Sequence, residues 1–138
     1  MKIRKMKQSD FKEMYTLWEK IGPAVNLASI NREEKEVIAM IRLNKNSCFV
    51  VVENGKIVGT VFGVFNGRRA WMYHLAVDSM YQNKGIGSVL VKKAEKALVK
   101  AGATKIRLWV AESNTQVIAF YAKQGYKKIP STILGKDF

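Results

Sequence analysis

The amino-acid sequence predicts an α/β fold built on a mixed sheet, and three observations lead to this prediction. Short β-rich runs alternate along the chain with longer segments whose apolar residues recur at helical spacing. The pair Asn54-Gly55 joins two of the β-rich runs and is a strong signal for a tight hairpin. The resulting order, β-α-α-β-β-β-α-β-α-β with a further strand at the end, gives six to seven strands and about four helices.

The first elements are a short strand and an amphipathic helix. Residues 1–6 alternate between polar and apolar side chains, which is typical of a half-buried strand. Ser9 is a candidate N-cap for the helix that follows, because its hydroxyl can accept a hydrogen bond from a first-turn amide. Gly22 is the predicted stop of this helix, whose apolar residues are Phe11, Met14, Leu17, Trp18 and Ile21.

A loop, a second helix and the hairpin come next. Residues 22–29 are predicted to form an apolar loop. Asn31 and Glu34 have the spacing of a capping box, so a helix is predicted from this point to about Leu43. Residues 47–67 then contain the two strands of the hairpin.

The second half of the chain alternates between strands and helices. In the helix that starts near Gly85, Lys92, Lys96 and Lys100 share one face. The opposite, apolar face is predicted to hold Leu90, Ala94, Ala97, Leu98 and Ala101. The predicted elements are a strand over 68–78, this helix over 85–102, a strand over 104–112, a helix over 114–125, and a short strand, a turn and a strand over 126–138.

Length and composition bound the classes of protein to which the chain belongs. A chain of 138 residues with 48% apolar content is the size of one domain, so a single domain over residues 1–138 is predicted. The single cysteine, Cys48, excludes an internal disulfide framework and fits a cytoplasmic location. The N-terminus lacks an apolar signal core, and no run approaches the roughly 18 apolar residues of a membrane helix. One histidine and one cysteine make no plausible zinc cluster, so no metal is expected.

The chain is strongly basic, with a formal net charge of +13. Such a charge attracts nucleic acids, anionic membranes and phosphorylated ligands, so a nucleic-acid-binding module is a rival interpretation. No recognised nucleic-acid motif accompanies the charge, however, and Trp71, Tyr73 and Trp109 fall in predicted core strands rather than on a basic platform. The sequence therefore argues against nucleic acid as the partner.

Two glycines one residue apart, Gly85 and Gly87, open the predicted helix after a strand and a loop. A helix start carries unpaired N–H groups and partial positive charge, which attract anions. Glycine there permits the φ values of a loop and lets a ligand approach the backbone closely. With Lys84 and the hydroxyl of Ser88 nearby, the segment predicts a cradle for a pyrophosphate group.

Two motifs resemble the signatures of the GNAT superfamily of acyl-CoA-dependent N-acetyltransferases. The first, Gln82-Asn83-Lys84-Gly85-Ile86-Gly87, matches Q/R-x-x-G-x-G/A and follows a strand that ends in Leu75-Ala76-Val77. The second places Phe120-Tyr121 and Gly125-Tyr126 after Asn114. The resemblance spans essentially the whole chain and is greatest to the small single-domain prokaryotic members, including those that acetylate protein N-termini and ribosomal-protein alanine.

This resemblance implies a GNAT fold and direct transfer of an acetyl group from acetyl-CoA to a primary amine, on a small molecule or a peptide, in a ternary complex. It implies that the backbone of Leu75, Ala76 and Val77 pairs with the pantetheine arm, that Asn114 hydrogen-bonds this arm, and that Tyr121 protonates the leaving thiolate. The implied pyrophosphate loop consists of Gln82, Asn83, Lys84, Gly85, Gly87 and Ser88. A binder of acyl-CoA that has lost catalysis is the alternative.

The general base is not identified by the sequence. Some relatives have a glutamate in the strand before the motif asparagine, but Trp109 stands at that position here and Glu112 lies too close to Asn114. Other relatives carry Glu or His in the strand before the loop, on the face that here holds Tyr73. His74 has the opposite parity, so packing or a surface position is favoured for it over a role as base, and a water relay is preferred.

The acceptor amine is also unspecified. Specificity is expected in residues 21–30, where Asn26 and Ser29 are the polar side chains, and near the C-terminal strand pair. A homodimer is left open because no sequence feature demands it. The role of six lysines is open as well, three of which could contact the 3′-phosphate of coenzyme A; the six are Lys92, Lys96, Lys100, Lys123, Lys127 and Lys128.

Overall fold

The computed structural model describes residues 1–22, 25 and 27–138. The chain divides into two compact units, Met1–Leu108 and Trp109–Phe138. Pro23, Ala24 and Asn26, which belong to the loop predicted to set acceptor specificity, lie outside the described residues. No helix of the described residues has the length and apolar content to cross a membrane.

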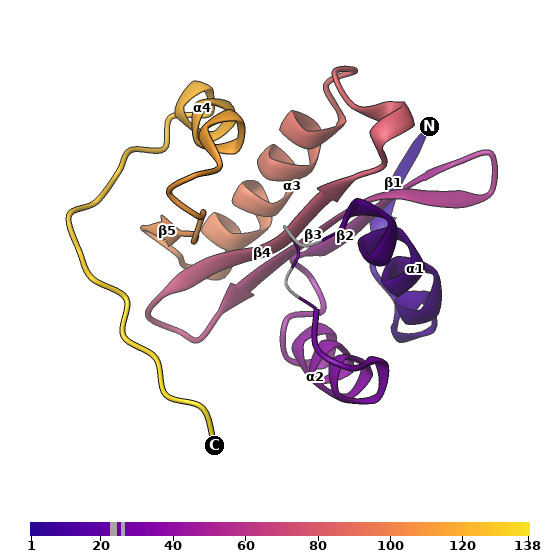
Figure 1. The fold of residues 1–138 in the computed structure, drawn as a ribbon, viewed down its shortest axis with the longest axis horizontal. Helices are drawn as coiled ribbons and strands as arrows, with labels where there is room; N and C mark the ends of the chain where they lie inside the picture. Colours follow the sequence, from indigo (N-terminus) through magenta and orange to yellow (C-terminus); the bar gives the residue numbers. More distant parts are fainter. Residues whose placement is uncertain (23–24, 26) are drawn as a thin grey trace. The chain divides into compact units, whose positions relative to one another are not determined.

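The first unit is built on a five-stranded sheet in the order β1-β2-β3-β4-β5 (Figure 1). Its strands are β1 (Lys2–Lys5), β2 (Cys48–Glu53), β3 (Lys56–Phe65), β4 (Ala70–Val77) and β5 (Ile106–Arg107). The first four strands pair antiparallel with their neighbours, whereas β5 pairs parallel with β4, which confirms the predicted mixed sheet. The predicted hairpin is confirmed too, since Asn54 and Gly55 have φ values of 51° and 73°.

The described residues contain five strands, fewer than the six to seven predicted. The predicted strand over 104–112 is a strand only at β5, and residues 126–138 contain neither helix nor strand. An alternating pattern shows that a segment would fit a pleated surface, but it does not supply a hydrogen-bonding partner. In residues 127–138 the large apolar side chains are exposed, namely Ile129, Ile133, Leu134 and Phe138.

Four α-helices are present in the described residues, as predicted. They are α1 (Phe11–Ile21), α2 (Ile30–Leu43), α3 (Ile86–Ala101) and α4 (Thr115–Lys123), with short 3₁₀ helices η1 (Gln8–Asp10) and η3 (Ser79–Tyr81). The predicted stop of α1 is confirmed, because Gly22 follows its last residue with φ at 95°.

The predicted start of α1 at Ser9 is wrong. Ser9 lies inside η1, and α1 begins two residues later at Phe11. The carboxylate of Asp10 organises this corner instead, because its Oδ2 accepts the Lys7 amide at 2.8 Å. Arg4 also donates to both oxygens of this carboxylate, at 2.8 and 2.9 Å. Such charge-assisted hydrogen bonds are stronger than those of a serine hydroxyl.

The predicted capping box of α2 is wrong as well. Its N-cap is Ser29, so Asn31 lies within the first turn. Glu33 rather than Glu34 reaches back over the helix start, where its Oε2 accepts the Ala28 amide at 3.0 Å. Glu33 thus makes the type of hydrogen bond expected of a capping glutamate, one residue before the predicted Glu34.

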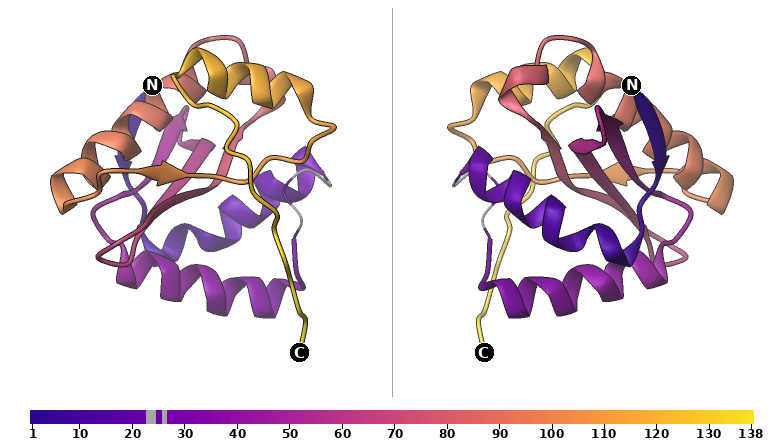
Figure 2. Two further views of the ribbon diagram at one scale, coloured as in Figure 1. Left: turned by 90° about the vertical axis from the view of Figure 1, so that its left-hand side faces the viewer. Right: turned by 90° about the vertical axis from the view of Figure 1, so that its right-hand side faces the viewer.

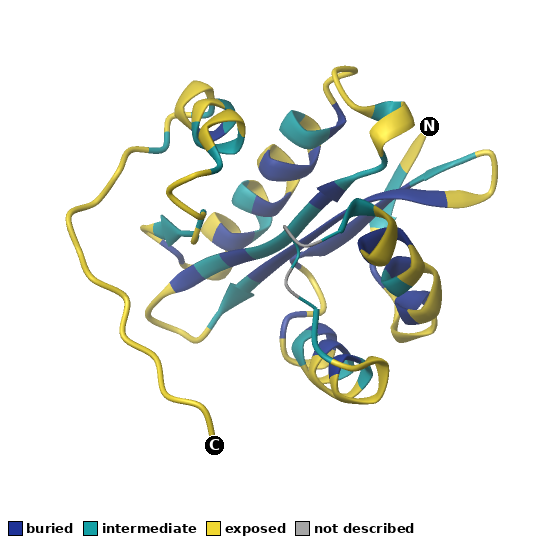
Figure 3. Ribbon diagram, viewed as in Figure 1, coloured by how far each residue is buried: buried dark blue, intermediate teal, exposed yellow. Residues whose placement is uncertain are grey.

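The sheet of the first unit separates two helical layers (Figure 2). A Cβ on Gly59 would lie 3.0 Å from Leu90 of α3, whereas the next residue, Thr60, hydrogen-bonds to Trp18 of α1. Successive strand residues point to opposite faces, so α3 covers one face and α1 the other. One buried cluster joins Trp18 to Val37 of α2 and Phe62 of β3, which places α2 on the α1 side. Figure 3 shows the buried residues along β2 and β3 and on the inner sides of these helices.

Candidate active site

A sharp turn leads from the end of β4 into α3. Asp78 caps η3 by accepting the Met80 amide at 3.0 Å, and residues 82–85 then reverse the chain into the helix. Asn83 and Gly85 take positive φ values of 63° and 81°, and Gly85 is the N-cap of the 16-residue α3. Residues 82–85 are exposed to solvent and Gly87 and Ser88 are partly exposed, so an anionic ligand can approach the start of α3 from this turn.

Side chains of the turn hold it against the strand from which it departs. The Gln82 side-chain amide donates to the carbonyl of Val77 at 3.0 Å. The Lys84 ammonium lies 5.4 Å from the centre of the Tyr81 ring, within the range of a cation–π contact. At the start of the turn, Asp78 forms an ion pair at 3.0 Å with Lys20 of α1. Gln82 therefore positions the turn through its side chain.

The middle of β4 contains a bulge. Thr60 pairs with Ala76 and Phe62 pairs with Tyr73, so β4 has one residue more than β3 between these pairs. His74 lies at this point with φ at 46°. On its other edge β4 pairs with β5 only at Ala70 and Trp71, so in the described residues of the first unit no strand pairs with this edge beyond Trp71. The backbone of Leu75, Ala76 and Val77 belongs to this edge.

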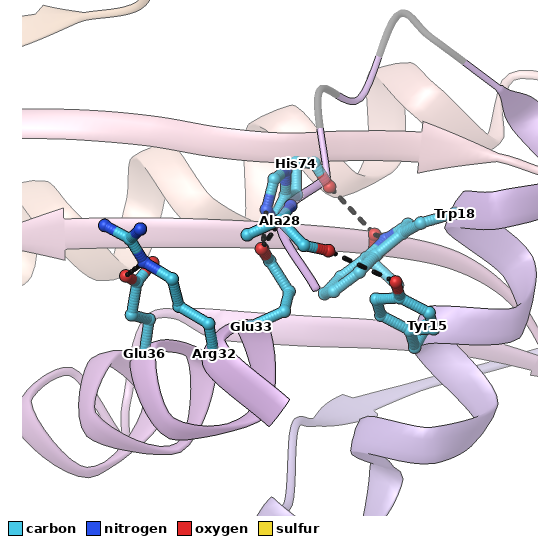
Figure 4. A network of polar contacts seen from close by, with 8 residues as sticks. Tyr15, Trp18, Ala28, Arg32, Glu33, Glu36 and His74 are labelled. Atoms are coloured by element: carbon cyan, nitrogen blue, oxygen red, sulfur yellow. Dashed lines mark hydrogen bonds and ion pairs between the residues drawn. The ribbon is translucent and has the colours of Figure 1, made fainter. Parts of the chain in front are cut away.

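The bulge brings the His74 imidazole into a polar network beneath α1 and α2 (Figure 4). Its Nε2 lies 3.3 Å from Oε1 of Glu33, and its ring centre lies 4.6 Å from that of Trp18. The His74 carbonyl accepts the Thr60 hydroxyl at 2.8 Å, and this hydroxyl accepts the Trp18 indole N–H at 3.0 Å. The sequence favours packing or a surface position for His74. The ring does pack against Trp18, but the sequence analysis did not predict its contact with Glu33.

Sequence reasoning missed Glu33, although the sequence contains a signal for it. The buried residues of α2 are Glu33, Val37 and Ile41, which recur every four residues along one face. A carboxylate on the apolar face of a helix needs a partner, because burial of an unpaired charge is costly. Here the partners are the Ala28 amide and the His74 ring.

The environment shifts the proton affinity of His74 in a definite direction. Burial lowers its pKa below the ordinary value, and the hydrogen bond and charge of Glu33 oppose this effect only in part. The imidazole is therefore neutral at neutral pH and has a nitrogen lone pair with which to accept a proton.

A pocket of about 350 Å³ lies between α2 and β4 and is named here the α2–β4 pocket. Its polar lining consists of Arg32, Glu33, Glu36 and His74. The rest of its wall is formed by Ala28, Val37, Met40 and Tyr73. Two of its lining residues, Tyr73 and His74, lie at the bulge of β4.

In the second unit, Asn114 and Tyr121 lie at opposite ends of α4. Asn114 is the N-cap, as the sequence predicts, and its Oδ1 accepts the Val117 amide at 3.4 Å. Tyr121 is 8% exposed, and its ring lies 5.1 Å from that of Phe120 and 5.5 Å from that of Tyr126. Burial raises the pKa of the Tyr121 phenol, which therefore keeps its proton at neutral pH.

Comparison with known proteins decides the family. The chain matches the acetyltransferase (GNAT) family over residues 6–126. This protein belongs to the GNAT family of acetyltransferases. An acetyltransferase of Pectobacterium atrosepticum is 35% identical over 136 residues, which cover 99% of this chain and 94% of that relative.

Solved GNAT structures share the fold. The PaiA N-acetyltransferase of Thermoplasma acidophilum, in complex with coenzyme A, is 21% identical with a TM-score of 0.79, and the match covers 95% of this chain and 92% of that one. The ribosomal-protein-S18-alanine N-acetyltransferase of Escherichia coli is 24% identical with a TM-score of 0.75, over 93% and 78% of the two chains. The predicted family and enzyme class are thus confirmed.

Several other side chains of this GNAT acetyltransferase are poor candidates for chemistry. Burial raises the pKa of the Cys48 thiol to about 12, which makes a nucleophilic role implausible. Glu112 is exposed in the second unit. Among the described residues, no three His, Cys, Asp or Glu side chains group as a metal site would need. The six lysines considered above, Lys92, Lys96, Lys100, Lys123, Lys127 and Lys128, are all exposed.

Proposed function

We propose that this GNAT enzyme transfers the acetyl group of acetyl-CoA to the nitrogen of a primary amine, directly and in a ternary complex. The observation that carries the proposal is the exposed turn over residues 82–85, where two positive φ values lead into the start of α3. Accessible amides at the start of a long helix suit a diphosphate, which is the anionic group of coenzyme A.

The proposed binding of the cosubstrate follows the chain from this turn toward the bulge. The diphosphate accepts hydrogen bonds from the first amides of α3, near Gly85 and Gly87, and from the Ser88 hydroxyl, with Lys84 and Asn83 beside it. On the edge of β4 that faces β5, no strand among the described residues of the first unit pairs at Leu75, Ala76 and Val77. This supports the proposed position of the pantetheine arm, because an extended arm can add to this edge like a further strand. Asn114 is the proposed partner of the pantetheine amides, and the Thermoplasma relative with its bound coenzyme A supports a coenzyme A site on this fold.

The proposed reaction forms one bond and breaks one bond. The neutral amine nitrogen attacks the thioester carbonyl carbon and the C–N bond forms. The C–S bond then breaks, the sulfur leaves as a thiolate, and the nitrogen releases one proton to solvent to become the amide. A backbone N–H of the β4 edge polarises the carbonyl oxygen. The Tyr121 phenol, which is protonated at neutral pH, gives its proton to the thiolate and then regains one from solvent.

Thermal melts test this function against the rival one. Acetyl-CoA at about 100 times its dissociation constant should add about 2.7 kcal/mol to the free energy of unfolding. Addition of a primary amine should then release free thiol, which a thiol reagent detects. Stabilisation by an oligonucleotide alone, lost at higher salt, would refute the proposal in favour of a nucleic-acid-binding module.

A further inference from the structure

The α2–β4 pocket has a lining whose charges can be counted. Two carboxylates, Glu33 and Glu36, and one guanidinium, that of Arg32, line it together with the neutral imidazole of His74. Arg32 pairs with Glu36 at 3.0 Å, so these two charges offset each other. The remaining charge is the carboxylate of Glu33, which is only 7% exposed. A protein with a net charge of +13 thus has a pocket with one net negative charge.

The remaining wall of the pocket is uncharged and mostly apolar. Ala28, Val37 and Met40 offer no polar side-chain group that donates hydrogen bonds, and Tyr73 contributes an aromatic ring and one phenol. A carbon skeleton without polar groups can cover these side chains and displace water from them. A skeleton with several hydroxyl groups would lose water here, and in this wall the Tyr73 phenol is the one side-chain group that could replace it.

We propose that the α2–β4 pocket holds the acceptor and selects a primary amine with one positive charge on an apolar carbon skeleton. The inference rests on the acetyl transfer proposed above and names the substrate class of that reaction. One buried carboxylate balances one ammonium group, whereas a second ammonium would face Arg32 and the basic surface of the chain.

The same geometry assigns the proton of the amine to His74. Both oxygens of Glu33 are engaged, Oε2 by the Ala28 amide and Oε1 by Nε2 of His74. When Nε2–H donates to the carboxylate, the lone pair of the imidazole is on Nδ1, which then takes the ammonium proton. His74 becomes an imidazolium, and the neutral amine is ready to attack the thioester. Glu33 is the positioning residue of this pair.

The groups around the imidazole determine how its proton affinity responds to mutation. From α2 the charged groups are Arg32, Glu33 and Glu36, and β4 contributes the neighbouring phenol of Tyr73. The side chains packed on the ring from α1 and β3 are Trp18 and Phe62, which do not titrate near neutral pH. Glu33 is the group that holds the pKa of His74 up, against the effect of burial.

An amine panel with the wild-type protein tests the substrate class. Phenethylamine carries one charge on an apolar skeleton, putrescine carries two charges, and glucosamine carries one charge on a polar skeleton. We expect phenethylamine to have a kcat/KM at least about tenfold above each of the others. An equal or higher value for putrescine or glucosamine overturns the proposal, and so does absence of turnover with phenethylamine while acetyl-CoA still stabilises the protein. Failure of acetyl-CoA to stabilise the protein refutes the acetyl transfer itself.

Reversal of the charge at Arg32 tests whether the charge of the pocket lining selects the amine. Arg32→Glu replaces the exposed guanidinium by a carboxylate and adds two units of negative charge to the lining. The ratio of kcat/KM for putrescine over phenethylamine should rise about fivefold or more, because the second ammonium then meets a carboxylate. An unchanged ratio contradicts selection by charge.

Two variants test the pair of His74 and Glu33, with Glu34→Gln as the matched control on the same helix. His74→Asn keeps a residue that tolerates positive φ and should lower kcat about 100-fold. Glu33→Gln should move the acidic limb of the pH profile of kcat/KM to lower pH, because it removes the charge that raises the pKa of His74. A purely structural role of Glu33 would leave this limb in place. Wild-type kcat in His74→Asn overturns the assignment.

Discussion

One residue of β4, His74, has an unusual backbone conformation. His74 has a positive φ, and the extra residue in β4 turns its imidazole toward Glu33 and Trp18. Alternation along a regular strand would place His74 on the face opposite to Tyr73. The bulge changes this direction, so that both side chains line the α2–β4 pocket. Tyr121 is a second residue whose proton affinity is changed by burial.

Replacement of Tyr121 by Phe removes the phenol and keeps the ring. We expect kcat for acetyl transfer to fall by about 10²-fold, because a positioned acid contributes roughly that much, and the Kd of acetyl-CoA to change little. Steady-state kinetics and calorimetric binding check the two halves of this statement. Tyr126→Phe, which alters the neighbouring ring of the second unit, is the control. Full turnover in Tyr121→Phe would show that another group protonates the thiolate.

At the scale of elements, the first unit depends on a few polar contacts between segments far apart in sequence. Thr60 joins β3 to α1 and to the bulge of β4. Arg4 and Asp10 join β1 to the start of α1. These contacts are side-chain hydrogen bonds within or beside the core, where loss of one partner leaves the other unsatisfied.

Thr60→Val should destabilise the protein by about 2 kcal/mol. The change keeps the shape of the side chain but leaves the Trp18 N–H and the His74 carbonyl without the hydroxyl that now pairs with both. Thr60→Ser retains the hydroxyl and should cost only about 1 kcal/mol for the lost methyl group. Urea denaturation measures both values, and equal stability of Thr60→Val and the wild type would contradict the role of this network.

The pair of Arg4 and Asp10 predicts a pH dependence of stability. Burial would raise the pKa of Asp10, but the hydrogen bonds from Arg4 and the Lys7 amide outweigh it and lower this pKa. A lowered pKa in the folded state means stability that is present above the unfolded pKa of about 3.9 and is lost as the pH falls through the folded value.

Asp10→Asn should therefore cost about 1–2 kcal/mol at pH 7, and the difference from the wild type should shrink as the pH falls below the unfolded pKa of about 3.9. Urea denaturation at a series of pH values gives the difference directly. Asp137→Asn, at the exposed C-terminal end, removes the same charge without a pair and serves as the control. A difference that is constant from neutral to acidic pH would contradict the ion pair as its source.

Sequence patterns predicted the elements of this chain well where they encode local geometry. The hairpin at Asn54-Gly55 and the stop at Gly22 follow from φ values that few residues adopt. The α3 face shows where periodicity alone falls short, because Val91 is buried and Ala101, expected on the apolar face, is exposed. The strand over 104–112 failed for another reason: its pattern fits a sheet, but pairing with β4 ends after two residues.

The candidate site shows the same division. The turn at Gly85 could be predicted because glycines at a helix start have a physical meaning that is local in sequence. The pair of His74 and Glu33 could not, because it joins residues 41 positions apart and depends on a bulge that no local pattern reveals. In the sequence, Glu33 is indicated only by its helical spacing from Val37 and Ile41, which are buried on the same face of α2.

At the scale of the whole molecule, the net charge of +13 has a kinetic consequence. Acetyl-CoA is an anion, so the field of the protein should speed its association, and salt should screen this field. The association rate constant should fall about threefold or more between roughly 20 and 300 mM salt, as measured by stopped flow. Uncharged pantetheine is the control, with a rate that salt leaves nearly unchanged. A rate for acetyl-CoA that ignores salt would contradict electrostatic steering.

The most direct test of the account is the affinity for coenzyme A of two variants at one position. Gly85→Asp and Gly85→Asn have nearly the same shape and both tolerate the φ of 81°, and no other group lies within 4 Å of a Cβ there. They differ in one negative charge placed where the diphosphate is proposed to bind. By calorimetry, Gly85→Asp should bind coenzyme A at least about tenfold more weakly than Gly85→Asn, while pantetheine binds both equally. Equal affinity of the two variants for coenzyme A would contradict the account.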